Sequence, residues 1–173
     1  GDLKCFFEQY LSSYKEEARQ NQVDICLEAH DREYPVIFDG GEMKRVVDNL
    51  FTNTIRYRSG ASSRVWIRIS RNQEEGRIRI RFQDDGPGVP GECLPRLFDT
   101  FYRTDEARSQ SGRGSGIGLA VVKEIITAHK GQVWAESREG LAILMEIPAA
   151  PEGEQEQEEE NGKEDDFGES TDY

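Results

Sequence analysis

The sequence predicts one α/β domain over residues 1–149, followed by an acidic tail over residues 150–173. Three stretches carry apolar residues at helical spacing, and five carry the alternating or continuous apolar residues of short strands. A long loop rich in Gly, Ser and Arg interrupts this series at residues 84–116. Loops of that length inside a compact domain are usually functional, so we look for a site there.

The expected helices each show one apolar stripe, which is typical of a helix packed on a core. Leu and aromatic residues form the stripe of the first helix, and Met, Val, Leu and Phe form that of the second. The third begins at a run of glycines. The expected helices cover residues 3–14, 43–59 and 116–128.

The expected strands are short and bounded by turn-forming residues. A further apolar run covers residues 35–38, and the second and third strands form a hairpin around residues 72–76. The last two strands form a closing hairpin. The expected strands are residues 23–27, 65–69, 78–82, 132–137 and 141–147.

The tail carries most of the net negative charge of the chain. Residues 151–173 hold 11 of the 34 acidic residues and one of the 22 basic residues, so the folded part is nearly neutral. Such a tail cannot bury a core and is expected to be disordered. No stretch approaches the roughly 20 apolar residues of a membrane span. Three cysteines and two histidines lack zinc spacing and fit a reducing cytoplasm. The first residue, Gly1, is typical of a fragment, so any membrane attachment is expected upstream of it.

Two glycine-containing segments have the composition of ligand-binding turns. The segment D-D-G-P-G-V, residues 84–89, follows a strand, and its glycines permit close approach of the backbone to a ligand. An aspartate there can accept a hydrogen bond from an amino group such as that of adenine; an ordinary turn is the alternative. The segment S-G-R-G-S-G-I-G-L, residues 111–119, opens a helix whose N-terminal N–H groups attract phosphates; a flexible linker is the alternative.

The second helix carries a polar stripe beside its apolar one. Asn49, Asn53, Arg56 and Tyr57 lie on this stripe, at positions i, i+4, i+7 and i+8. An Asn oxygen suits Mg²⁺ that is held jointly with phosphates. An Arg can meet phosphate oxygens, and a Tyr offers a ring to a base. A solvated helix face is the alternative.

In this order, the segments resemble the catalytic, ATP-binding domain of bacterial sensor histidine kinases. The superfamily also holds gyrase, heat-shock chaperone and mismatch-repair ATPases. The asparagine box reads V-V-D-N-L-F-T-N-T-I-R-Y, the phenylalanine box L-F-D-T-F-Y-R-T-D and the second glycine box G-R-G-S-G-I-G-L-A-V-V-K. The resemblance covers about residues 2–148. It implies the Bergerat fold, a two-layer α/β sandwich with about three helices on one face of a mixed sheet and a long ATP lid.

The resemblance also implies roles for individual residues. Asp84 matches the aspartate that reads the adenine amino group. Asn53 matches the Mg²⁺-binding asparagine, and Asn49 is its companion and a further candidate metal ligand. Arg56 and Arg103 join these asparagines as the expected catalytic residues. The other expected ATP contacts are Tyr57, Gly86, Gly88, Val89, Phe98, Phe101, Tyr102, Gly114, Ser115, Gly116, Ile117, Gly118 and Leu119.

One position separates the kinases of this superfamily from its hydrolases. The hydrolases carry a glutamate four residues before the Mg²⁺-binding asparagine, as general base for water, whereas this chain has Asn49. Phosphoryl transfer is therefore favoured. The implied partners are a histidine-containing dimerisation domain, absent from this sequence, and a response regulator receiver domain. His30 and His129 are interpreted as structural. We expect a monomeric fragment that contacts no nucleic acid.

Two other functions stay open, an anti-sigma-type serine kinase and a pseudokinase that acts as a binding module. The phenylalanine box argues against the first, and the intact asparagine and glycine boxes argue against the second. The third glycine-rich segment of the family is short here, since residues 138–140 lead straight into the last strand. Alternating arginines at residues 64–68 and 77–81 predict a strongly basic outer sheet face, either simply solvated or covered by the acidic tail.

Overall fold

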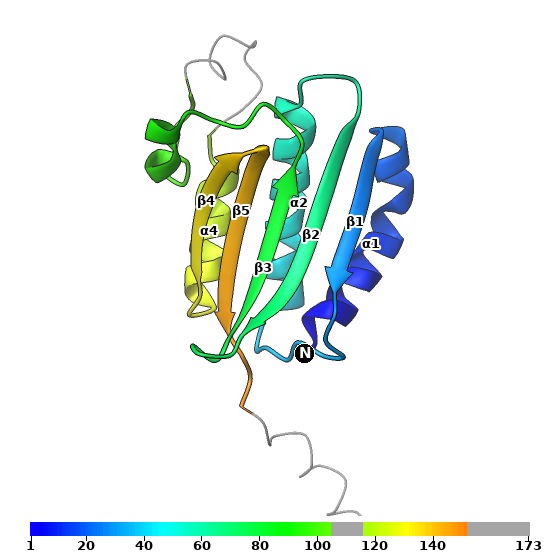
Figure 1. Cartoon of the computed structure of the whole chain (residues 1–173), viewed down its shortest axis with the longest axis vertical. Helices are drawn as coiled ribbons and strands as arrows, with labels where there is room; N and C mark the ends of the chain where they lie inside the picture. The colour runs from blue at the N-terminus through cyan, green and yellow to red at the C-terminus, as the bar shows by residue number, and fades with distance from the viewer. Residues whose placement is uncertain (105–115, 152–173) are drawn as a thin grey trace, which may run out of the picture.

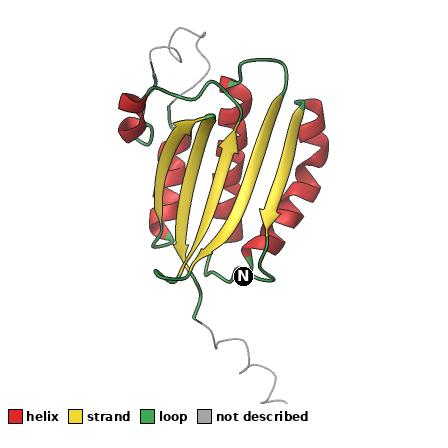
Figure 2. Ribbon diagram, in the orientation of Figure 1, coloured by secondary structure: helices red, strands yellow, loops and turns green. Residues whose placement is uncertain are grey.

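Five strands form one mixed sheet with helices on one of its faces in the computed structural model, which describes residues 1–104 and 116–151 (Figures 1 and 2). The strand order is β1-β2-β3-β5-β4; β1 and β2 are parallel, and the other neighbours are antiparallel. The predicted two-layer α/β arrangement is confirmed. The elements are α1 (Leu3–Gln20), β1 (Val23–Ala29), α2 (Gly40–Tyr57), β2 (Ser63–Asn72), β3 (Arg77–Asp84), the 3-10 helix η1 (Gly91–Arg96), α4 (Gly118–Ala128), β4 (Gln132–Arg138) and β5 (Gly140–Pro148).

The predicted elements are all present, although several begin or end a few residues from the predicted bounds. Helix α4 begins at Gly118 rather than Gly116, because Gly116 has a φ of +68°, which an α-helix excludes. Helices α1 and α2 begin at the N-cap residues Asp2 and Asp39, whose carboxylates each accept a backbone N–H at 2.8 Å. Within the described part of the chain, no helix is long and apolar enough to cross a membrane.

An aromatic cluster joins α2 to α1 and to the sheet. Phe51 of α2 stacks on Tyr14 of α1 with ring centroids 4.6 Å apart, and it meets Phe82 of β3 edge-on at 5.0 Å. The Tyr10 hydroxyl donates to Asp48 Oδ1 over 2.7 Å, so a polar contact also joins the two helices. Burial of the apolar stripe fixes the orientation of α2 about its own axis. Its polar stripe therefore faces the cavity described below.

The open face of the sheet is charge-paired, which corrects the prediction of a strongly basic face. The arginines of β2 and β3 alternate as expected, but carboxylates on neighbouring strands lie beside most of them and neutralise them. Glu146, on the open face of β5, is buried under its partner. The tail lies outside the described residues, so its binding to this face stays a prediction. The pairs are Arg64–Asp24, Arg68–Glu28, Arg79–Glu146 and Arg81–Glu136.

His129 joins the end of α4 to the start of α2. Its Nδ1 lies 2.8 Å from the Ile125 carbonyl oxygen, and its Nε2 accepts the Asp39 N–H at 2.9 Å. The ring is therefore the Nδ1–H tautomer, because Nε2 is used as an acceptor. Both nitrogens serve the backbone, which supports the structural interpretation of this residue.

We expect the His129→Ala substitution to lower the free energy of unfolding by about 1–2 kcal/mol, because it removes both hydrogen bonds. Urea denaturation of the purified chain measures this change. Lys123, an exposed residue of the same helix, provides the control. The Lys123→Ala substitution should change the free energy by less than about 0.5 kcal/mol. Equal values for the two variants would contradict the linking role of the imidazole.

Candidate functional site

A cavity lies at one end of the sheet, between α2, the loop that follows β3, and the start of α4. In Figure 1 this is the end where the arrow of β3 terminates. Three segments far apart in the sequence meet there, and most of the predicted site residues line the cavity. Its lining residues are Asn53, Arg56, Tyr57, Asp84, Pro87, Gly88, Val89, Leu97, Tyr102, Arg103, Thr104, Gly116, Gly118, Leu119 and Leu141.

Helix α2 supplies the polar wall of the cavity. Asn53, Arg56 and Tyr57 are at positions i, i+3 and i+4 and therefore share one face of the helix. Beside this face, Leu50 and Phe51 are buried in the core. Burial of these apolar residues holds the amide, guanidinium and phenol groups at the cavity.

Asp84 ends β3 and is the one carboxylate among the described residues that line the cavity. Its Oδ1 accepts the N–H of Gly86 at 2.9 Å and the N–H of Leu141 at 3.1 Å. Burial raises the pKa of Asp84, and these two hydrogen bonds oppose part of that increase. Both bonds go to Oδ1, so Oδ2 remains available to accept a hydrogen bond from a ligand. A half-buried carboxylate fixed in this way is suited to recognise one amino group.

The turn between β4 and β5 holds the Asp84 loop in place. The Ser137 hydroxyl accepts the Val89 N–H at 2.9 Å. Gly88 has a φ of +69°, and a Cβ there would overlap Ser137 Oγ. Gly140 has a φ of +92°, and a Cβ there would overlap the carbonyl oxygen of Asp84. Ser137 and Gly140 therefore support the candidate site directly.

We expect the Gly140→Ala substitution to lower the free energy of unfolding by about 1–3 kcal/mol, because it combines a left-handed backbone with a clash against Asp84. Gly76 offers a matched control, since its φ is +60° but no atom lies within 4 Å of the added Cβ. Thermal denaturation of the two variants separates the clash from the backbone strain. A loss for Gly140→Ala no greater than that for Gly76→Ala would show that the contact with Asp84 is unimportant.

The start of α4 presents backbone donors to the cavity. Its N-cap residue is Ile117, whose side chain cannot accept a hydrogen bond. The first backbone N–H groups of the helix are therefore not capped by the N-cap side chain. Gly118 packs against Asn49, whose Oδ1 would lie 3.2 Å from a Cβ at position 118. Gly116 accepts the Phe101 N–H at 3.0 Å. An uncapped helix N-terminus lined by glycines is a ready site for phosphate groups.

Some predicted residues do not line the cavity. Phe98 is buried in the core, Phe101 is 70% exposed, and Ile117 is 38% exposed. Asn49 lies behind Gly118, and its Nδ2 donates to the Arg45 carbonyl at 2.8 Å. The sequence interpretation also missed the apolar part of the wall, because Pro, Leu and Thr side chains in loops carry no distinctive pattern. The missed lining residues are Pro87, Leu97, Thr104 and Leu141, and the predicted contacts outside the described residues are Gly114 and Ser115.

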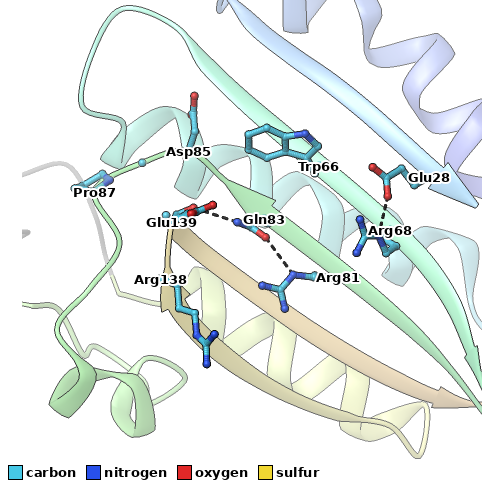
Figure 3. A pocket seen from close by; sticks show the side chains of 11 residues that line it. Glu28, Trp66, Arg68, Arg81, Gln83, Asp85, Pro87, Arg138 and Glu139 are labelled. Carbon is cyan, nitrogen blue, oxygen red and sulfur yellow. Dashed lines mark hydrogen bonds and ion pairs between the residues drawn. The ribbon is translucent and has the colours of Figure 1, made fainter.

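A second hollow lies on the open face of the sheet, on the other side of the Asp84 loop (Figure 3). Pro87 lines both spaces. The side chains of this hollow largely bond to one another: Arg68 pairs with Glu28, and Gln83 accepts from Arg81 and donates to the Glu139 carbonyl. Of the predicted site residues, one lines this hollow, Gly86. We therefore place the candidate site in the cavity beside α2.

The donor set of the cavity suits Mg²⁺ that arrives with a nucleotide. In residues 1–104 and 116–151, no group of three or more His, Cys, Asp or Glu side chains is arranged to hold a metal ion. The wall does offer the Asn53 amide oxygen, which is a hard ligand. Mg²⁺ prefers one or two protein ligands together with phosphate oxygens and water, so these residues fit such an ion.

Comparisons with known proteins agree on one family. Residues 38–151 match the model for "histidine kinase-, DNA gyrase B-, and HSP90-like ATPase". Over 113 residues, 64% of this chain, the sequence is 43% identical to sensor protein kinase WalK of Staphylococcus aureus. The chain covers 27% of one WalK sequence and 18% of another, so it spans about a quarter or less of these relatives.

Solved structures share the fold. The catalytic domain of histidine kinase ThkA superposes with a TM-score of 0.71 and 25% identity, over 86% of this chain and 93% of that domain. The mycobacterial sensor histidine kinase MprB gives a TM-score of 0.73 and 25% identity, over 87% and 98% of the two chains. ThkA in complex with the response regulator TrrA gives 0.69 and 24% identity, over 88% and 42% of the two chains, and shows the same fold.

Proposed function

Since the chain belongs to the family of histidine kinase-, DNA gyrase B- and HSP90-like ATPases, and is homologous to the ATP-binding catalytic domains of sensor histidine kinases, we propose that its cavity binds Mg-ATP and presents the γ-phosphate to a histidine on a separate dimerisation domain. The convergence of Asp84, Asn53 and the uncapped start of α4 on one cavity is the observation that carries this proposal.

In this proposal, each wall of the cavity binds a different part of the nucleotide. Asp84 accepts a hydrogen bond from the adenine amino group, and the ring of Tyr57 and neighbouring aliphatic side chains pack against the base. The N–H groups at the start of α4 bind phosphate oxygens, and Arg56 adds positive charge beside them. Asn53 holds the Mg²⁺, which neutralises the phosphate charge when it is bound.

The same wall favours phosphoryl transfer over hydrolysis. Among the described lining residues, Asp84 is the one carboxylate, and two backbone N–H groups already fix its Oδ1. Asn49, where the hydrolases carry a glutamate, has an amide that cannot act as a general base at neutral pH. Positioning and charge neutralisation therefore carry the reaction, as in other phosphotransferases.

The proposed partners follow from this reaction. The domain needs an acceptor histidine on another domain, and the phosphoryl group then passes to the receiver domain of a response regulator. A domain that consumes ATP is expected on the cytoplasmic side of any membrane to which its parent protein is attached. The predicted division into residues 1–149 and 150–173 remains part of this proposal.

Calorimetric titration of the chain with ATP, with and without Mg²⁺, tests the proposal. We expect saturable binding that Mg²⁺ changes, because the cavity supplies one metal ligand and the nucleotide supplies the others. Absence of binding at millimolar ATP by a folded sample would contradict the proposal and favour a binding module. If ATP binds, acid treatment of a labelled partner distinguishes the two kinase classes, since phosphohistidine is acid-labile and phosphoserine is not.

A further inference from the structure

Two arginines of the open sheet face, Arg77 and Arg138, have no ion-pair partner among residues 1–104 and 116–151. Arg77 begins β3 and lies on the same face as Arg79, because both alternate with buried isoleucines. Arg138 ends β4 and lines the hollow on this face (Figure 3). The four ion pairs described above use the carboxylates of the strands and the other arginines. These pairs therefore leave two positive charges of the face unneutralised.

The guanidinium of Arg77 contains a buried donor. Its Nη1 is buried and has no hydrogen-bond partner in the described part of the chain. An arginine stays protonated in proteins, so this donor cannot be removed by loss of a proton. Buried polar atoms in native proteins nearly always have a partner. The side chain of Arg77 is therefore suited to an acceptor that the described residues do not supply.

The acidic tail of the chain starts beside Arg77. The register of the sheet places Arg77 opposite Pro148, and the Ala149 N–H donates to the Gly76 carbonyl at 2.9 Å, so the chain leaves the sheet at this point. Glutamates follow at every second position from 152 to 158 and again at 159 and 160, with no basic residue among them. In an extended chain, alternate side chains point to the same side. An extended tail therefore presents a row of carboxylates to one surface.

We propose that residues 152–160 bind along the open face of the sheet as an extended segment, with their carboxylates on Arg77 and, further along, on Arg138. Both arginines face β5, where their partners Pro148 and Gly140 are eight residues apart. Eight residues of a strand span about 27 Å, and nine extended residues reach about 30 Å. Asp85 and Glu139 also line the hollow beside Arg138. The contact with Arg77 therefore contributes most of the attraction.

The surface between the two arginines has the composition of a protein interface. Trp66 and Trp134, which are both tryptophans of the chain, belong to this face, and the Arg79 guanidinium lies 5.5 Å from the centre of the Trp134 ring. Trp and Arg are enriched in interfaces. A second copy of the chain is a poorer occupant than the tail, because its open face brings the same unpaired arginines and repels the first.

Acrylamide quenching of Trp134 fluorescence in the full chain, with Trp66→Phe as background, tests the proposal. A tail variant replaces Glu152, Glu154, Glu156 and Glu158 with Gln. Its quenching constant should exceed that of the natural tail by about 2-fold at low salt, because the uncovered ring is more accessible. In about 1 M salt the two should agree, since the ion pairs are screened. The control variant loses the same charge outside the proposed segment, through Glu164→Gln, Asp165→Asn, Asp166→Asn and Glu169→Gln, and should behave as the natural tail does.

A second pair of variants tests the role of Arg77. The Arg77→Gln substitution should raise the quenching constant, and it should add nothing in the tail variant, because both changes remove the same contact. The Lys123→Gln substitution removes one positive charge from the exposed side of α4 and is the control. Equal quenching of the natural tail and the tail variant at low salt would overturn the inference. Protection that increases with protein concentration would also overturn it, since the tail would then bind another copy. No nucleotide is present, so the outcome is independent of the proposed function.

Discussion

Replacing Asp84 with Asn is expected to weaken ATP binding by about 10- to 150-fold, because it removes a charge-assisted hydrogen bond of about 1.5–3 kcal/mol. The Asn Oδ1 can keep the hydrogen bonds from Gly86 and Leu141. Its amide nitrogen then stands in place of the free carboxylate oxygen, so a donor faces the adenine amino group. Calorimetric titration with ATP measures the loss.

The same substitution should stabilise the nucleotide-free domain at neutral pH. Because the folded-state pKa of Asp84 is raised, its contribution to stability is complete below the ordinary pKa of 3.8 and is lost as the pH rises through the folded value. Asn does not titrate. The stability of Asp84→Asn relative to the natural chain should therefore increase with pH across this window, as measured by urea denaturation at a series of pH values.

Asp85 provides the control for both measurements. Its side chain is exposed, and its Oδ1 accepts the Arg64 N–H at 2.9 Å, away from the cavity lining. The Asp85→Asn substitution removes the same charge one residue further along the chain and should change ATP affinity by less than about 2-fold. Equal losses in the two variants would point to overall charge rather than to a specific hydrogen bond.

Replacing Asn53 with Ala is expected to remove the effect of Mg²⁺ on ATP binding and to slow phosphoryl transfer in the parent kinase by about 100- to 1,000-fold. The amide oxygen of Asn53 is the hard ligand on the cavity wall, and Ala offers no substitute. The measurement compares ATP affinity with and without Mg²⁺. Binding without Mg²⁺ should change little, because Asp84 and α4 remain intact.

The Thr52→Ala substitution is the control for Asn53, since Thr52 is its exposed neighbour on α2. This variant should respond to Mg²⁺ as the natural chain does. A full Mg²⁺ effect in Asn53→Ala would assign the metal to another ligand, and Asn49 would then be the first to test. Such a result would leave nucleotide binding itself unaffected and would change the proposed chemistry alone.

Periodicity made the fold and much of the cavity predictable. The apolar stripe of α2 fixed which side of the helix carries Asn53 and Tyr57, because burial of one face determines the other. The D-D-G-P-G-V and glycine-rich segments were recognisable because glycines where a loop meets a strand or helix are typical of tight turns and of close backbone approach to a ligand. The two ends of the cavity were therefore expected from residues 84–89 and 111–119 once these were combined with the asparagine-bearing helix and the family resemblance.

The remaining features depend on contacts between distant residues. Nothing local to Gly140 indicates that it packs against Asp84, and nothing local to Gly88 indicates that it packs against Ser137. Likewise, the sheet face that carries the arginines of β2 and β3 was predicted to be strongly basic, because the acidic partners of these arginines lie on other strands. The sheet register that brings Glu146 beside Arg79 follows from pairing across β3 and β5, which a single sequence does not specify.

Both ends of the described domain are tied to one short segment, at the end of the sheet opposite the cavity (Figure 1). Gly1 exchanges backbone hydrogen bonds with Val36, and the Ala150 N–H donates to the Pro35 carbonyl at 2.8 Å. A strand of eight residues such as β3 is about 26 Å long, and it separates that segment from Asp84. At that distance, a rotation of the sheet by a few degrees about Pro35 and Val36 would displace Asp84 by more than an ångström, without any rearrangement inside the cavity.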